Sequence, residues 1–124
     1  MRTEGIKPNL SEQNKARNMF VKDEIFSQIE SGQKTCELRL AYDSFLRIKP
    51  GQILEFKAAN KKSLRARVVG SRKYKTFESM LEKEDLSKIA PGISKDQAVL
   101  DCQRLFDKKY ATELGLVVIE FKKI

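Results

Sequence analysis

The feature that most constrains the fold is a continuous apolar run near the C-terminus, Leu116 to Phe121, which follows Gly115. Its length and β-branched content are typical of a central strand. Residues 53–58 and 63–71 instead alternate polar and apolar side chains on either side of a turn at residues 59–62, which predicts an antiparallel hairpin with one wet face. We therefore expect a mainly antiparallel sheet at the centre of the molecule.

Helices are predicted around this sheet. The further predicted elements are strands at 18–21 and 35–40, a helix at 22–31 that Asp23 caps and Gly32 ends, short helices after Thr76 and Asp85, and a long helix from Ser94 to Tyr110. This pattern favours the α+β fold class, a small barrel of mostly antiparallel strands with flanking helices. The chain has 124 residues, which suits one domain. We expect an N-terminal tail at residues 1–17 and the domain at residues 18–124.

The lack of histidine restricts the chemistry. With no histidine in the chain, the commonest general base, the commonest nitrogen metal ligand and the Ser-His and Cys-His nucleophile systems are missing. Cys36 and Cys102 fall on apolar faces without a Cys-x-x-Cys pair, so we expect buried thiols. We expect no metal and no cofactor, and any catalysis would use Lys, Glu, Asp, Tyr, Ser or Thr.

The best lead to function is the segment Gly-Gln-Lys-Thr-Cys-Glu-Leu-Arg at residues 32–39. Alternation along the predicted strand places Glu37 and Arg39 on one face, with Lys34 beside the helix end. We expect a basic cleft here, in which Lys34 and Arg39 bind a phosphate or the polar edge of a base. Glu37 would orient Lys34 or act as a general base. The alternative is a structural ion pair of Glu37 with Arg39, contributing under about 1 kcal/mol if exposed.

Positive charge is concentrated in one stretch. The formal net charge is +8, and residues 57–75 contain eight basic side chains and no acidic one. Such a surface attracts phosphate backbones, although a solvated strand and hairpin tip in a merely basic protein would give the same pattern. The candidate RNA contacts in this stretch are Arg65, Arg67, Arg72, Lys73 and Lys75.

Two tyrosines are candidates for stacking on single-stranded bases, because each lies beside cations. Tyr74 stands between two lysines at the end of the basic stretch. Tyr42 follows Arg39 by three residues, and we expect it either to form a wall of the cleft or to pack at the surface. Tyr110 lies on the apolar stripe of the predicted long helix, so we expect it in the core.

Several motifs together resemble the ASCH domain family, named for homology to activating signal cointegrator-1. They are Ile29 to Arg39, Ile48-Lys-Pro-Gly51, Tyr74 to Leu81, Pro91-Gly92, Tyr110 and Gly115 to Phe121. The resemblance extends from about Met19 to Lys123 and implies the PUA-like fold, a pseudobarrel with flanking helices. It also implies a partner, since PUA-like domains chiefly bind RNA or modified nucleotides.

The resemblance also implies possible catalysis, because some small ASCH proteins are hydrolases. One activity is a ribonuclease, and another removes the acetyl group from N4-acetylcytidine with a Lys, a Thr and a Glu. That lysine corresponds to Lys34, the threonine falls on Glu37, which departs from the family, and the glutamate falls within residues 78–85. If the chain is an enzyme, the resemblance assigns catalysis to Lys34 and Glu37.

Three functions are therefore open. The favoured one is a module that binds RNA or a modified nucleoside or nucleotide. The others are a small hydrolase acting on nucleosides or RNA, and a protein-interaction domain whose basic surface meets an acidic partner. No apolar run reaches the roughly 20 residues of a membrane span, and residues 1–13 contain no apolar signal core. We expect a cytoplasmic monomer with no membrane partner.

Overall fold

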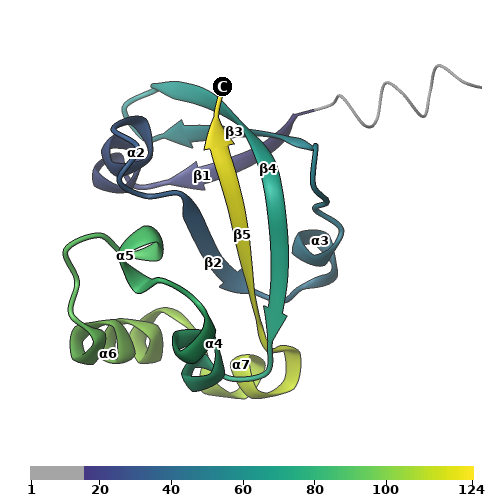
Figure 1. The fold of residues 1–124 in the computed structure, drawn as a ribbon, viewed down its shortest axis with the longest axis vertical. Helices are drawn as coiled ribbons and strands as arrows, with labels where there is room; N and C mark the ends of the chain where they lie inside the picture. Colours follow the sequence, from purple (N-terminus) through teal and green to yellow (C-terminus); the bar gives the residue numbers. More distant parts are fainter. Residues whose placement is uncertain (1–15) are drawn as a thin grey trace, which may run out of the picture.

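The computed structural model describes residues 16–124. Their strands form one sheet in the order β1-β3-β4-β5-β2, in which β1 and β3 run parallel and every other pair is antiparallel. The sheet curls into a half-barrel (Figure 1). The strand bounds are β1 Arg17–Val21, β2 Cys36–Leu40, β3 Ile53–Ala58, β4 Ser63–Tyr74 and β5 Leu116–Lys123. The predicted α+β class with mostly antiparallel strands is confirmed.

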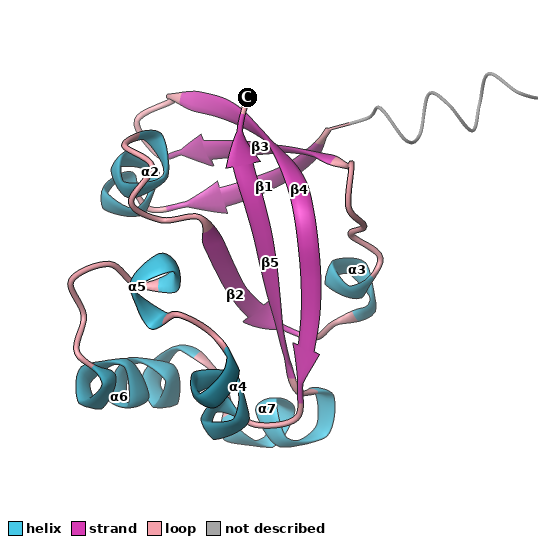
Figure 2. Ribbon diagram, in the orientation of Figure 1, coloured by secondary structure: helices cyan, strands magenta, loops and turns pink. Residues whose placement is uncertain are grey.

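Helices cover both the inside and one end of the half-barrel. The helix bounds are α2 Asp23–Glu30, α3 Asp43–Leu46, α4 Phe77–Lys83, α5 Leu86–Ile89, α6 Lys95–Leu105 and α7 Lys108–Leu114. Figure 2 shows α4, α6 and α7 gathered at the lower end of the sheet, and α5 beside β2, between these helices and α2. None of the helices in residues 16–124 has the length and apolar character needed to cross a membrane.

The apolar run near the C-terminus is a central strand, as predicted. Val117, Ile119 and Phe121 of β5 point into the main core, which α2 also enters through Phe26. Val118 points to the opposite side, into a second apolar cluster formed with α4 and α5. Because both faces of β5 are covered, every position from 116 to 119 is buried.

The two edge strands, β1 and β2, meet at the open seam of the half-barrel. Arg39 on β2 donates a hydrogen bond from Nη2 to the carbonyl oxygen of Phe20 on β1, at 3.3 Å. The guanidinium groups of Arg17 and Arg39 lie over the Phe45 ring, at 5.0 and 5.4 Å from its centroid. Side chains therefore bridge a seam that backbone hydrogen bonds leave open.

The predicted long helix from Ser94 to Tyr110 is wrong. The helix ends at Leu105, and the side chain of Asp107 accepts a hydrogen bond from the Lys109 backbone N–H at 2.8 Å, which starts a second helix. The changed direction leaves Leu105 and Tyr110 exposed, at 71% and 46%. Tyr110 is therefore not a core residue.

The other predicted helix boundaries hold with one exception. The side chains of Thr76, Asp85 and Ser94 cap their helices as expected. Asp23 does not cap α2, because Lys22 holds the N-cap position and the Asp23 carboxylate accepts from the backbone N–H of Asn60 at 3.1 Å. Of the predicted tail at 1–17, residues 1–15 lie outside the described residues, and Arg17 already belongs to β1.

Candidate functional site

The structure brings Lys34, Glu37 and Arg39 together in one hydrogen-bonded group. Lys34 Nζ lies 3.0 Å from Glu37 Oε1, and Arg39 donates to Glu37 Oε2 from Nε and Nη2 at 3.0 and 2.7 Å. Gly32 makes this possible by taking a φ of +84°, which ends α2 and turns the chain into β2. Alternation along β2 then places Glu37 and Arg39 on the same face.

Lys34 uses all of its donors within the protein. Its Nζ donates to the carbonyl oxygens of Cys36 and Ile89, both at 2.6 Å, and to Glu37. An ammonium has three N–H groups, so none is left for a ligand. Because Ile89 is the last residue of α5, these hydrogen bonds of Lys34 hold α5 against the start of β2.

Glu37 is a buried carboxylate that stays ionised. Burial by itself favours the neutral acid, but the charges of Lys34 and Arg39 and their hydrogen bonds outweigh it and lower the pKa of Glu37 below its ordinary value. The carboxylate therefore remains a hydrogen-bond acceptor at neutral pH. It does not have the raised pKa that a carboxyl acting as general acid or base at neutral pH needs.

These residues form part of the wall of a cleft of about 610 Å³, which we call the Lys34 cleft. Apolar side chains dominate its surface, among them Leu38, Met80 and Ile89. Other residues of its wall are Lys22, Glu24, Ile25, Gln28, Lys34, Glu37, Arg39, Ala90, Pro91, Ile93, Asp101, Cys102 and Leu105. The three cations in this list match the three anions, so the expectation of a basic cleft is wrong in charge, although a cleft is present.

Two predicted RNA contacts lie on β4, away from the cleft. Arg65 pairs with Glu55, with Nε 3.3 Å from Oε1, and Arg67 donates to the carbonyl oxygen of Gly51 at 3.1 Å. Both side chains are exposed, as the alternation of the strand predicts. They remain candidates for phosphate contacts only.

Arg72 and Tyr74 are engaged in a network with acidic residues. Arg72 donates to both oxygens of Glu84, at 2.6 and 2.9 Å, and to Glu120 at 2.9 Å. The Tyr74 hydroxyl donates to Glu84 as well. Hydrogen bonds from Arg72 lower the pKa of Glu84, whereas burial and the bond to Glu84 raise the pKa of Tyr74. Since Glu84 caps the C-terminal end of α4, the network fastens α4 to the sheet.

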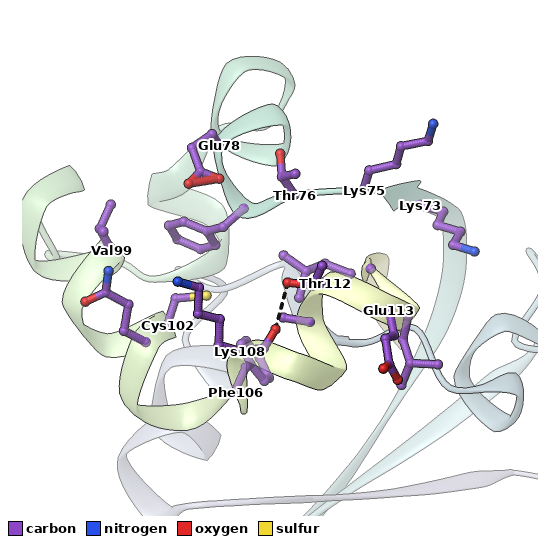
Figure 3. Close-up of a pocket in the computed structure, with 16 residues that line it drawn as sticks. Lys73, Lys75, Thr76, Glu78, Val99, Cys102, Phe106, Lys108, Thr112 and Glu113 are labelled. Carbon is purple, nitrogen blue, oxygen red and sulfur yellow. Dashed lines mark hydrogen bonds between the residues drawn. The ribbon is translucent and has the colours of Figure 1, made fainter.

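Lys73 and Lys75 lie at a second cavity of about 870 Å³ between β4, α4, α6 and α7 (Figure 3). The ammonium groups of both lysines point away from the cavity, on the side opposite Lys108. Phe77, Cys102 and Phe106 line both this cavity and the Lys34 cleft. Cys102 is thus half-buried rather than fully buried as predicted, and burial, with Glu78, raises its pKa to about 11.

Tyr42 lines neither cavity. It holds the N-cap position of α3 and is 43% exposed, which matches surface packing, the second of the two expectations for it. Cys36 is buried as predicted, and burial and the nearby Glu120 raise its pKa.

The sequence reasoning missed most of the cleft wall. Gln28 on α2 and Asp101 on α6 carried no signal, because a polar residue on an amphipathic helix is usually solvated. The contribution of α5 and its following loop could not be found locally, since Ile89 and Lys34 are 55 residues apart. Within residues 16–124, no group of three His, Cys, Asp or Glu side chains is arranged to hold a metal ion.

Of the positions implied by the amidohydrolase resemblance, Lys34 and Glu37 line the cleft, but no acidic residue of the stretch 78–85 does. Residue 37, at which the resemblance implies a threonine, is a glutamate in this chain. Of residues 78–85, Met80 alone lines the Lys34 cleft, and Glu84 is bound to Arg72 and Tyr74 instead.

A curled half-barrel with helices at one end and a cleft beside its seam defines a PUA-like α+β domain. The family model of the ASCH domain matches residues 19–124. The chain therefore belongs to the ASCH domain family, whose PUA-like members generally bind RNA. The resemblance inferred from the sequence motifs is confirmed.

Solved structures agree with this assignment. The chain is 32% identical to hypothetical protein PH0355, whose crystal structure superposes with a TM-score of 0.79 over 89% of this chain and 100% of that one. Protein PF0455 from Pyrococcus furiosus, a solution structure, is 30% identical, with a TM-score of 0.71 over 89% of this chain and 98% of that one.

A third structure, the ASCH domain from Lactobacillus crispatus JV V101, is 17% identical, with a TM-score of 0.58 over 93% of this chain and 84% of that one, and it supports the fold alone. No curated protein matches the chain significantly.

Proposed function

We propose that this ASCH domain binds RNA or a modified nucleotide by seating one base in the Lys34 cleft. The observation that carries the proposal is Glu37, a buried and ionised carboxylate on the wall of a cleft of about 610 Å³. A cleft of this volume is within the range of about 300–1,000 Å³ typical of small-molecule sites. Its apolar surface with a few fixed polar groups suits an aromatic ring with a polar edge.

The balance of positive and negative side chains in the cleft wall supports binding of a base rather than a phosphate inside the cleft. Positive and negative side chains balance in its wall, and Lys34 has no free donor. Phosphates would instead remain at the surface, where Lys22 stands at the cleft and Arg65, Arg67, Lys73 and Lys75 are available on or after β4. Phosphate contacts position a strand, while contacts to the base select it.

The arrangement of Lys34 and Glu37 does not support a hydrolase activity in the same way. A lysine whose three N–H groups are already bound is not free to polarise a substrate carbonyl, and a carboxylate with a lowered pKa is a weak general base. We therefore keep the binding function as the proposal.

The proposal is tested by the affinity of the full chain for short fluorescent single-stranded RNAs, measured by anisotropy over a series of salt concentrations. Arg39→Met removes a polar group of the cleft, and Arg65→Met is the matched control on the exposed face of β4. We expect Arg39→Met to weaken binding about tenfold at every salt concentration. We expect Arg65→Met to change mainly the slope of the logarithm of the binding constant against the logarithm of the salt concentration, by about one unit or less.

A thermal melt of each variant checks that it is folded. Absence of binding to any RNA would overturn the proposal, and so would equal losses for the two variants that vanish together at high salt. Binding of an acidic protein without a steep salt slope would favour the interaction domain instead.

A further inference from the structure

One buried polar atom beside the Lys34 cleft has no hydrogen-bond partner among residues 16–124. It is Oε1 of Gln28, on the α2 side of the cleft. A buried acceptor without a partner loses its hydration and gains nothing in return, so native structures contain few of them. A ligand that donates a hydrogen bond to Gln28 would offset that loss.

Two other side chains of the wall, Glu37 and Arg39, also have unused hydrogen-bonding sites. A carboxylate has about four acceptor sites. Lys34 occupies one at Oε1 of Glu37 and Arg39 occupies two at Oε2, so one site at Oε1 is open. Arg39 uses Nε and Nη2, and its Nη1 makes no hydrogen bond within the described part of the chain.

Contacts show which of these groups are neighbours along the wall. Arg39 binds Oε2 of Glu37, and Lys34 binds Oε1. The backbone N–H of Lys34 donates to the carbonyl oxygen of Gln28 at 3.0 Å, so Gln28 neighbours Lys34, whose ammonium binds Oε1 of Glu37. The half-buried Gln28 can turn its amide toward the cavity about its last torsion, which has a broad energy minimum.

The wall thus offers one donor, Arg39 Nη1, and two acceptors, Glu37 Oε1 and Gln28 Oε1. Resting on the proposed function, we propose that the Lys34 cleft selects guanine through its base-pairing edge. O6 would accept from Arg39, the N1–H would donate to Glu37, and the N2 amino group would donate to Gln28. Base edges in single-stranded RNA are read by such hydrogen bonds.

The other standard bases fit this set of groups poorly. Uracil presents carbonyl oxygens on both sides of its single N–H. Cytosine and adenine place an unprotonated ring nitrogen beside their amino group, which would face the negative charge of Glu37. A site with committed polar groups rejects ligands that leave those groups unpaired.

The test uses the full chain with guanosine, inosine, 1-methylguanosine, cytidine, uridine and adenosine as ligands in calorimetric titrations. Inosine lacks only the N2 amino group, and 1-methylguanosine lacks the N1–H. We expect guanosine to bind about tenfold more tightly than inosine, and 1-methylguanosine to lose at least as much.

Two variants give an independent readout. Gln28→Met removes the unpartnered amide at similar size, and Gln33→Met makes the same change at an exposed position that lines neither cavity. Without ligand, we expect Gln28→Met to raise the melting temperature by a few degrees, on the order of 3 °C, and Gln33→Met to leave it unchanged. With ligand, we expect Gln28→Met to remove the preference for guanosine over inosine.

The outcomes separate the inference from the function on which it rests. If RNA binds but guanosine is not preferred, or if Gln28→Met lowers the melting temperature and keeps the preference, guanine selection is overturned and RNA binding stands. If neither nucleosides nor RNA bind, both are overturned.

Discussion

Lys34 Nζ and Glu37 Oε1 form an ion pair at 3.0 Å, and the two side chains are only 4% and 11% exposed. Charges this deeply buried are tolerated when each has partners that replace water. Here the ammonium has two carbonyl oxygens besides the carboxylate, and the carboxylate has Arg39 besides the ammonium. The pair thus connects β2 to α5 and also forms part of the cleft wall.

Replacing Lys34 should weaken the contact between β2 and α5 and destabilise the domain. We expect Lys34→Met to lower the free energy of unfolding by about 3–5 kcal/mol, because Glu37 would keep only Arg39 and two buried carbonyl oxygens would lose their donor. Urea unfolding followed by circular dichroism measures this change. Lys57→Met, at an exposed lysine 4.0 Å from Glu55, is the control and should change stability by less than about 1 kcal/mol. A loss as small as that of the control would contradict the structural role of Lys34.

Acid should destabilise the domain through Glu37. Its pKa is lower in the folded than in the unfolded state, so the unfolded chain takes up the proton first as the pH falls. Stability is therefore full above the ordinary glutamate value of about 4.3 and is lost as the pH falls through the lowered folded pKa. Urea unfolding from pH 7 to pH 2.5 should show this loss, with Glu84 adding to it in the same direction. The Glu37→Gln variant should show a flatter pH dependence, and an unchanged slope would contradict the assignment.

Gly115 should tolerate no side chain. Its φ is +79°, and a Cβ atom there would lie 2.6 Å from the backbone oxygen of Tyr74. Gly51 has a φ of +94° but open space around the same position, so it isolates the effect of backbone strain. We expect Gly51→Ala to cost about 1–2 kcal/mol and Gly115→Ala to cost at least about 1 kcal/mol more, as measured by thermal unfolding. Equal losses of stability for the two variants would show that the backbone of β4 at Tyr74 shifts easily to make room for the added Cβ atom.

The network around Arg72 should be visible in a tyrosine titration. Burial, followed by the hydrogen bond to Glu84, raises the pKa of Tyr74. Glu84→Gln should therefore bring that pKa back toward the ordinary value of about 10. Absorbance at alkaline pH measures the change once Tyr42 and Tyr110 are replaced by phenylalanine. A Tyr74 titration that is the same with and without Glu84 would show that the two side chains do not interact in solution.

Local patterns were sufficient for much of the fold. The run Leu116 to Phe121 identified a strand buried on both faces, and the Thr76 and Asp85 caps placed two helices. The break at Asp107 could not be read, because an aspartate fits a helix surface and a cap equally well, while the apolar spacing continued through it. Only the packed structure decides between those two roles.

For the site, the sequence indicated which residues meet but not what they do. Alternation on β2 brought Glu37 and Arg39 together, yet the partners that occupy Lys34 come from α5 and from the backbone of Cys36. Likewise, the basic stretch gave no sign that Arg72 pairs with Glu84 and Glu120, which lie 12 and 48 residues away along the chain. Long-range pairing of this kind leaves no local signal.

The central claim is that the Lys34 cleft is where the domain holds RNA. Amide chemical-shift changes on titration of a short single-stranded RNA test it most directly, because they report on all strands and helices at once. The account predicts that the largest changes occur around Gln28, from Glu37 to Arg39 and from Ile89 to Ile93. Changes confined to the outer face of β4 around Arg65 and Arg67, with the cleft unaffected at saturation, would contradict it.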